Sequence, residues 1–158
     1  MGKLSDAFKI DEDKIRIREF EYHGQTFKVR VPKSTEAEEM AKRVDNPTQE
    51  AVDIYFNSLS KDLYAKRKEI EESGADIKFK GDDVIVGENS LRDLAKSQAS
   101  TDIRILESIK LLVPMDGTTL GDITYADIDA EFPKPIQISL VKKIAEIISA
   151  GYDDLRKN

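Results

Sequence analysis

The sequence predicts an α+β fold that is mostly helical, with an N-terminal antiparallel hairpin followed by a helical bundle with a small second hairpin. Three patterns support this prediction. Apolar and polar side chains alternate over residues 20–31, as in strands with one buried face. From residue 34 onward, apolar residues recur at the three- and four-residue spacing of amphipathic helices. Residues 77–86 interrupt the helices and contain two short apolar runs around a glycine turn.

The chain of 158 residues is expected to form one domain over residues 15–158, preceded by a mobile arm of residues 1–14. The arm has few apolar side chains among its Lys, Asp and Glu residues and lacks the apolar run of a signal peptide. A hydrophobic content of 39% across the chain is sufficient for one core.

The first hairpin is predicted around a turn at His23 and Gly24. On either side of this turn every second residue is apolar, which places one face of both strands in the core. Pro32 follows, and since proline cannot donate a backbone hydrogen bond, the ladder should end there. The residues expected on the buried face are Phe20, Tyr22, Phe27, Val29 and Val31.

Two helices are predicted between the hairpins. Thr35 and Glu38 have the spacing of a capping box, in which side chains and backbone amides pair reciprocally at a helix start, so a helix should run from there to about Val44. A longer helix is expected to begin at Pro47 and to reach Ser73 before Gly74, a residue suited to the left-handed conformation that ends helices.

Two further helices are predicted after the second hairpin. Ser90 or Asn89 can cap a helix that Pro114 ends. After a glycine-rich turn, Thr124 can cap a short helix that continues to Phe132.

The predicted C-terminal helix, residues 136–152, has an unusually wide apolar face. With successive residues about 100° apart, its apolar side chains cover roughly 200°, whereas a core-facing helix needs a stripe somewhat over 100° wide. One side of this arc can seal the core while the other binds a partner. An internal element covering the whole arc is an equally good interpretation. The predicted partner-binding residues are Ile138, Val141, Ile144, Ala145, Ile148 and Tyr152.

The residues that carry chemistry predict no catalytic site, no cofactor and no metal, and therefore a protein that is not an enzyme. His23 is the only histidine and there is no cysteine, so a catalytic triad would need a turn residue and no thiolate is available. The acidic clusters lack the ligand spacing of a calcium loop. The glycine-rich stretch at residues 117–121 lacks the lysine of a phosphate-binding loop.

The charge balance and the apolar runs exclude two classes of partner. A formal net charge of −6 disfavours a nucleic-acid interface. No stretch approaches the roughly 20 apolar residues of a membrane span. We therefore expect neither a nucleic acid nor a membrane as partner, and the lack of cysteine suits a reducing cytosol.

Two stretches of the chain resemble the tail assembly chaperones of long-tailed (siphovirus-type) bacteriophages. One is the hairpin FEYHGQTFKVRVP at residues 20–32, which runs directly into the acidic helix STEAEE at residues 34–39. The other is LGDITYADIDAEFP at residues 120–133, followed by the Ile-rich helix. On this resemblance, residues 15–158 form a single chaperone domain.

The resemblance implies a small protein of the host cytoplasm that binds the phage tape-measure protein through apolar helical surface. Such a protein keeps its client soluble, promotes assembly of the tail tube and is absent from the finished virion. The tail-tube protein is a further implied partner. The sequence leaves open that the chain also forms a homo-oligomer.

Two other functions use the same apolar surface. A virion structural protein, such as a tail-completion or connector component, would use it for permanent subunit contacts. A homodimeric adaptor protein would pair it with its own copy across a two-fold axis. The sequence leaves these alternatives open.

Overall fold

The computed structural model describes residues 2–157, including their side chains except at residues 12, 13 and 151–157. The fold is α+β, with 59% of residues in helices and 16% in strands. An antiparallel hairpin near the N-terminus precedes the helices, and a small second sheet lies in the middle of the chain. The predicted fold class is therefore confirmed.

The chain divides into two compact units, each with its own hydrophobic core. The terminal unit combines residues Met1–Met40 with Arg104–Asn158, and the central unit comprises Ala41–Ile103. The single domain and the mobile arm expected from the sequence stay predictions.

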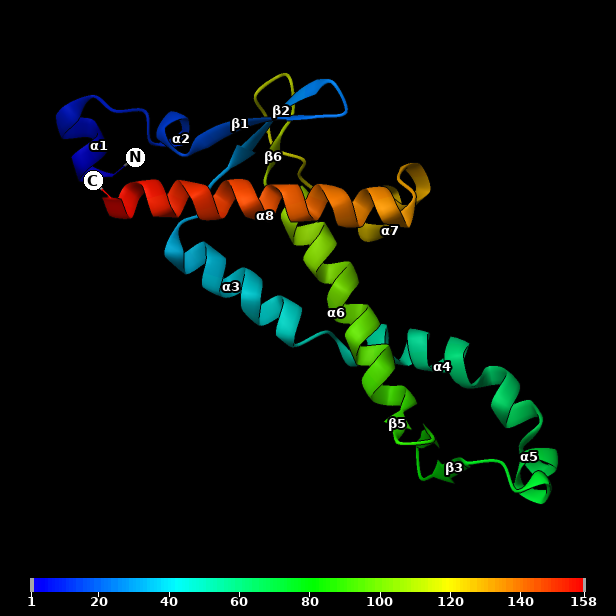
Figure 1. Ribbon diagram of the computed structural model, residues 1–158. Helices are drawn as coiled ribbons and strands as arrows, with labels where there is room; N and C mark the ends of the chain where they lie inside the picture. Colours follow the sequence, from blue (N-terminus) through cyan, green and yellow to red (C-terminus); the bar gives the residue numbers. More distant parts are fainter. Residues whose placement is uncertain (1, 158) are drawn as a thin grey trace. The chain divides into compact units, whose positions relative to one another are not determined.

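The terminal unit contains a three-stranded sheet and the C-terminal helices (Figure 1). Its elements are α1 (Lys3–Phe8), α2 (Glu12–Ile15), β1 (Ile17–Tyr22), β2 (Gln25–Arg30), β6 (Leu112–Val113), α7 (Tyr125–Glu131) and α8 (Lys134–Lys157). Two helices are shared between the units: α3 (Ser34–Asp45) begins in the terminal unit, and α6 (Leu91–Ile109) ends in it.

The hairpin of β1 and β2 forms as the alternation predicts. Tyr22 pairs with Gln25 across a two-residue turn, in which His23 and Gly24 have φ angles of 50° and 76°. Positive φ at both positions is the geometry whose twist matches that of the flanking strands. Glycine adopts it without strain, whereas histidine does so uncommonly.

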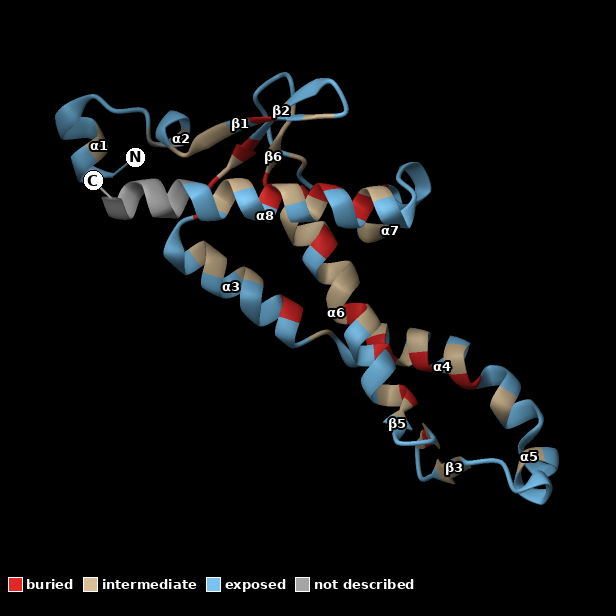
Figure 2. Ribbon diagram, viewed as in Figure 1, coloured by how far each residue is buried: buried red, intermediate tan, exposed pale blue. Residues whose placement is uncertain are grey.

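The core of the terminal unit lies between the sheet and the helices α6, α7 and α8. The ring of Phe20 stacks on that of Phe27, with 5.5 Å between centroids, and Val29 is fully buried. Figure 2 shows buried residues on the hairpin and along the middle of α8. The helical contributions to this core are Ile105, Ile109, Ile128, Leu140 and Ile144.

The central unit packs two helices and the start of α6 around a second small sheet. Its remaining elements are α4 (Gln49–Ala65), α5 (Arg67–Ser73), β3 (Ile77–Lys80), β4 (Asp83–Val86) and β5 (Asn89–Ser90). The strands are antiparallel in the order β3-β4-β5. Its core consists of Val52, Phe56, Val84, Leu91, Ala95 and Ala99.

The helix predicted from Pro47 to Ser73 is instead divided in two. Lys66 leaves helical geometry, with φ −109° and ψ 19°, and separates α4 from α5. The predicted end is correct, because Gly74 adopts the left-handed conformation with a φ of 74°. The start of α4 is capped by Thr48, whose hydroxyl accepts a hydrogen bond of 3.2 Å from the amide of Ala51.

Candidate functional site

Three of the predicted partner-binding residues on α8 turn toward the chain's own core. Ile144 is only 1% exposed, and Val141 and Ile148 are partly buried against the same cluster. Their spacing of three and four residues places them on one side of the helix. Ile144 therefore belongs to the core and offers no accessible surface to a partner.

The other predicted residues lie toward the outer side of α8. Ile138 is 53% exposed, and Ala145, seven residues later, is also exposed. Tyr152 belongs to α8, but its side chain lies outside the described ones. The accessible apolar surface on the described part of this helix therefore includes fewer residues than the six predicted from the sequence.

A larger accessible apolar surface is a groove in the terminal unit with a volume of about 390 Å³. Its lining comes from the hairpin end of β2, from the segment that leaves α6 through β6, and from α7 with the loop before it. We call it the β2–α7 groove. Its apolar side chains include Phe27, Leu112, Val113, Leu120, Ile123 and Phe132.

One wall of the groove arises because the third strand of the sheet is short. β6 pairs with β2 at Lys28 and Val29, and Pro114 follows. Proline has no backbone N–H, so it cannot extend the ladder. The hairpin end of β2 therefore continues past the end of β6, and the side chain of Phe27 lines the space that is left.

Another part of the lining comes from α7, whose start is fixed by the capping box that Thr124 predicts. The Thr124 hydroxyl accepts from the amide of Asp127, and the Asp127 carboxylate accepts from the amide of Thr124 at 2.8 Å. Ile128, only 3% exposed, anchors the helix in the core. Asp127 and Glu131, one turn apart, line the groove.

A buried glutamine fixes α7 against the start of α8. Gln137 is fully buried, and its side-chain amide donates to Asp129 Oδ1 at 2.9 Å and to the carbonyl of Phe132 at 2.7 Å. Its side-chain oxygen accepts from the hydroxyl of Tyr125 at 2.9 Å. Because a buried polar group is costly without partners, this network holds the α7 wall in one position.

The segment that forms much of the groove has an uneven charge. Residues 111–133 contain five Asp or Glu residues and no Lys, Arg or His. Met115, in the same segment, has a fully exposed side chain, and Phe132 is 39% exposed. The groove thus combines accessible apolar side chains with a negatively charged margin.

The residue pattern along the chain did not predict this groove. One signal was present, namely apolar residues in a glycine-rich turn that carries only acidic charges. The pairing of β6 with β2 had no local signal, because it joins residues more than eighty positions apart. The amino-acid composition of this segment therefore indicated an apolar and acidic surface, but nothing in the sequence indicated a groove.

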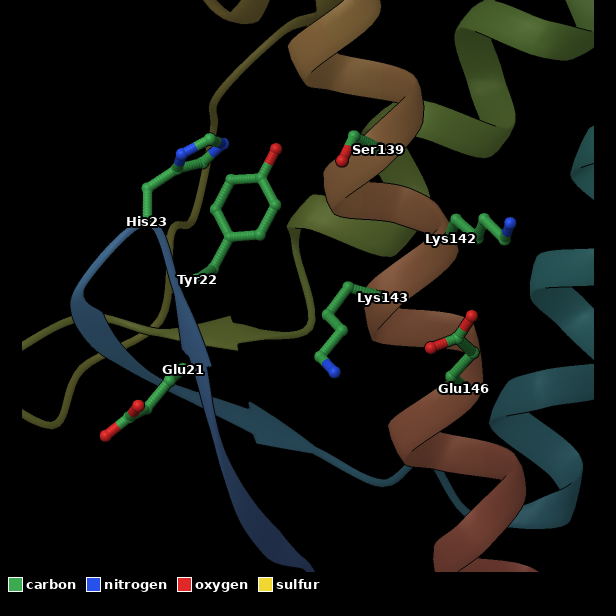
Figure 3. Close-up of a pocket in the computed structure, with 7 residues that line it drawn as sticks. All are labelled: Glu21, Tyr22, His23, Ser139, Lys142, Lys143 and Glu146. Carbon is green, nitrogen blue, oxygen red and sulfur yellow. The ribbon is translucent and has the colours of Figure 1, made fainter.

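A second pocket, of about 420 Å³, lies between the end of β1 and α8 and is polar (Figure 3). The ring of Tyr22 meets that of His23 edge-on, with 4.4 Å between centroids. Among the described side chains, the hydroxyl of Tyr22 is the buried polar atom that lacks a hydrogen-bond partner. The charged side chains of the pocket are Glu21, Lys142, Lys143 and Glu146, so neither sign dominates.

Charged groups in the central unit hold its small sheet to α6. Burial works to raise the pKa of Asp83, but hydrogen bonds from the Ser90 hydroxyl and the amides of Arg92 and Val84 outweigh it and leave that pKa below its ordinary value. The guanidinium of Arg92 lies 4.1 Å from the ring centroid of Phe56 and 3.0 Å from Asp53. These contacts tie the start of α6 to β4 and α4.

In the described part of the chain, the side chains form no group of three or more His, Cys, Asp or Glu residues that could hold a metal ion. None of the helices there has both the length and the apolar content to cross a bilayer.

Comparison with known proteins identifies no relative. The chain matches no protein-family model, no curated protein and no solved structure.

Proposed function

We propose that the chain is a tail assembly chaperone of a long-tailed bacteriophage and that its β2–α7 groove binds helical segments of the tape-measure protein. In this role it acts in the host cytoplasm, keeps its client soluble while the tail tube assembles, and leaves before the virion is complete. The proposed activity is binding, without catalysis, cofactor or metal.

One observation carries the proposal. The two stretches that resemble the chaperone family, residues 20–32 and 120–133, come together around the same groove. The first contributes Phe27, and the second contributes Leu120, Ile123 and Phe132. They are separated by more than eighty residues in the sequence, so their meeting at one accessible apolar surface supports a shared role.

The apolar lining of the groove suits the apolar side chains of a helix. Its volume of about 390 Å³ falls in the range of small-molecule pockets, about 300–1,000 Å³, and so accommodates a few inserted side chains. An amphipathic helix inserts side chains at positions i, i+3 or i+4 and i+7 into such a groove. Burial of apolar surface contributes about 25 cal/mol per Å² before the costs of association are subtracted.

The test is co-expression of the chain with fragments of the tape-measure protein of the same phage, followed by co-purification. We expect Met115→Asp and Phe132→Ser to abolish recovery of the fragment, because both side chains are accessible at the groove. The matched control is Ile54→Asp, at a residue of the central unit that is 63% exposed. This control should bind like the wild type.

Two further results decide between this proposal and the alternatives. Circular dichroism should show the same helical content in all variants, and a folded groove variant that still retains the fragment would refute the groove as the site. Mass spectrometry should not detect the chain in purified virions. Its presence there would instead favour a virion structural protein, and a client-independent dimer in sedimentation would favour an adaptor.

A further inference from the structure

We infer that the β2–α7 groove selects a basic amphipathic helix, in which two Lys or Arg residues one turn apart flank the apolar stripe. This inference rests on the proposed function, because it specifies the client segment that the same groove accepts. It follows from the charge and spacing of two side chains on α7 and from the composition of the surrounding segment.

The two acidic residues at the margin of the groove lie on the same helix. Asp127 and Glu131 lie four residues apart on α7 and both line the groove. One helical turn corresponds to a rise of about 5.4 Å, so a client helix lying along α7 would match these carboxylates with cations at its own positions i and i+4. Cations at i and i+3 would lie at nearly the same spacing.

The two carboxylates differ in the hydrogen bonds that they already accept within the chain. Asp127 accepts hydrogen bonds from the amide and the hydroxyl of Thr124, so part of its hydrogen-bonding capacity serves the helix cap. Among the described contacts, no ion pair or hydrogen bond engages Glu131. Glu131 is therefore the residue expected to discriminate between clients.

Among the residues whose side chains are described, no Lys, Arg or His lines the groove. The segment from 111 to 133 contains no basic residue. The nearest following cation, Lys134, lies over the ring of Tyr125, 5.0 Å from its centroid, and donates to the Tyr125 hydroxyl at 2.8 Å. The negative potential of the margin is thus available to a partner, and it favours a positively charged one.

The charge is expected to set selectivity and association rate more than total affinity. Apolar burial supplies most of the binding energy, whereas each solvent-exposed ion pair changes affinity by about two- to fivefold. Electrostatic steering raises the association rate at low salt and loses its effect as salt increases. The preference for a basic helix should therefore weaken at high ionic strength.

The test uses two synthetic helical peptides with the same apolar residues, one carrying Lys and the other Glu at paired flanking positions. Fluorescence anisotropy measures their binding to the full chain at low and high salt. We expect the Lys peptide to bind at least about fivefold more tightly than the Glu peptide at low salt. Glu131→Lys should remove or reverse this preference. Glu39→Lys, an equal charge change at an exposed residue on α3 in the same unit, should leave it unchanged.

The outcomes separate this inference from the function on which it rests. Equal binding of both peptides, with Met115→Asp still abolishing it, would overturn the selectivity and leave the groove in use. Binding of the Lys peptide that survives Met115→Asp would also overturn the inference, because the peptide would then occupy another site. Selective binding of the Lys peptide without capture of any tape-measure fragment would instead refute the proposed function.

Discussion

In the central unit a charged side chain covers an aromatic ring of the apolar core, whereas in the terminal unit accessible apolar side chains line a groove. Arg92 lies over Phe56 and is held there by Asp53. In the terminal unit, Phe132 and Met115 stand at an open groove. The two regions are built from the same kinds of elements, a small antiparallel sheet against helices, so the difference lies in how each completes its surface.

This difference separates a stabilising role from a binding role. Arginine can cover an aromatic ring with its planar guanidinium while remaining hydrated at its edges, which completes a small core without further elements. An accessible apolar groove gains no such stabilisation, because its side chains leave water only when a partner covers them. The terminal unit is therefore the region in which partner binding is expected.

The largest expected effect tests which side of α8 belongs to the core. Ile144→Ala should lower the free energy of unfolding by about 2–5 kcal/mol, because it leaves a cavity at a residue that is 1% exposed. Ile138→Ala, on the exposed side, should change it by about 0.5 kcal/mol or less. Urea denaturation followed by circular dichroism measures both. Similar losses at the two positions would contradict the division of this helix into an inner and an outer side.

The next effect concerns the charged groups of the central unit. Asp83→Ala removes the acceptor for the Ser90 hydroxyl and for the amides of Arg92 and Val84, and should cost about 2–3 kcal/mol. Hydrogen exchange should accelerate in the central unit and stay unchanged in the terminal unit. Asp82→Ala, at a side chain that is 87% exposed, is the control. Uniform acceleration across both units would show that they do not open separately.

A smaller effect is the acid dependence of the terminal unit. Hydrogen bonds from Arg30, at 2.7 and 2.8 Å, lower the pKa of Glu36 against the opposing effect of burial. The unfolded chain therefore binds this proton more readily, so the stabilisation is present above about pH 4.3, the ordinary value for Glu, and is lost as the pH falls through the lower folded-state pKa.

Glu36→Gln should reduce stability by about 1 kcal/mol at pH 7 and by progressively less in acid. Melting temperatures measured between pH 3 and 7 compare its pH dependence with that of the wild type. A constant difference between the two proteins over this whole range would show that the ionised carboxylate of Glu36 is not the source of its contribution.

The smallest effect is at the polar pocket. Tyr22→Phe removes a buried hydroxyl that lacks a hydrogen-bond partner, so it should be neutral or stabilise the protein by up to about 1 kcal/mol. Tyr64→Phe, at a residue that is 38% exposed, should be neutral. Chemical denaturation measures both variants. A clear loss of stability for Tyr22→Phe would mean that this hydroxyl is satisfied in solution.

The sequence predicted the elements whose signals are local. Alternation placed β1 and β2, and Thr124 capped α7. The helix predicted to continue to Pro114 ends earlier, at Ile109, and β6 follows it. The break at Lys66 was missed because neither it nor its neighbours differ in helix propensity from the residues around them. Local sequence signals were therefore sufficient to predict elements whose boundaries depend on the capping or turn chemistry of a few adjacent residues.

Features that depend on contacts between residues far apart in the sequence could not be predicted from local patterns. Periodicity showed which residues of α8 share a face, but it could not show that the core takes Ile144 and leaves Ile138 exposed. The groove likewise depends on the pairing of β6 with β2. Such features are determined by which elements meet in space, and that information is not present in the spacing of side chains along one helix or strand.

The order of the terminal unit along the chain has a consequence during translation. Its hairpin is synthesised first and ends at Arg30, whereas α7, the last element to complete the groove, ends at Glu131, about one hundred residues later. At about 5–20 residues per second this interval is roughly 5–20 s. A nascent chain on the ribosome therefore presents the hairpin before the groove exists, and under the proposed function it would bind a client only after translation has passed α7.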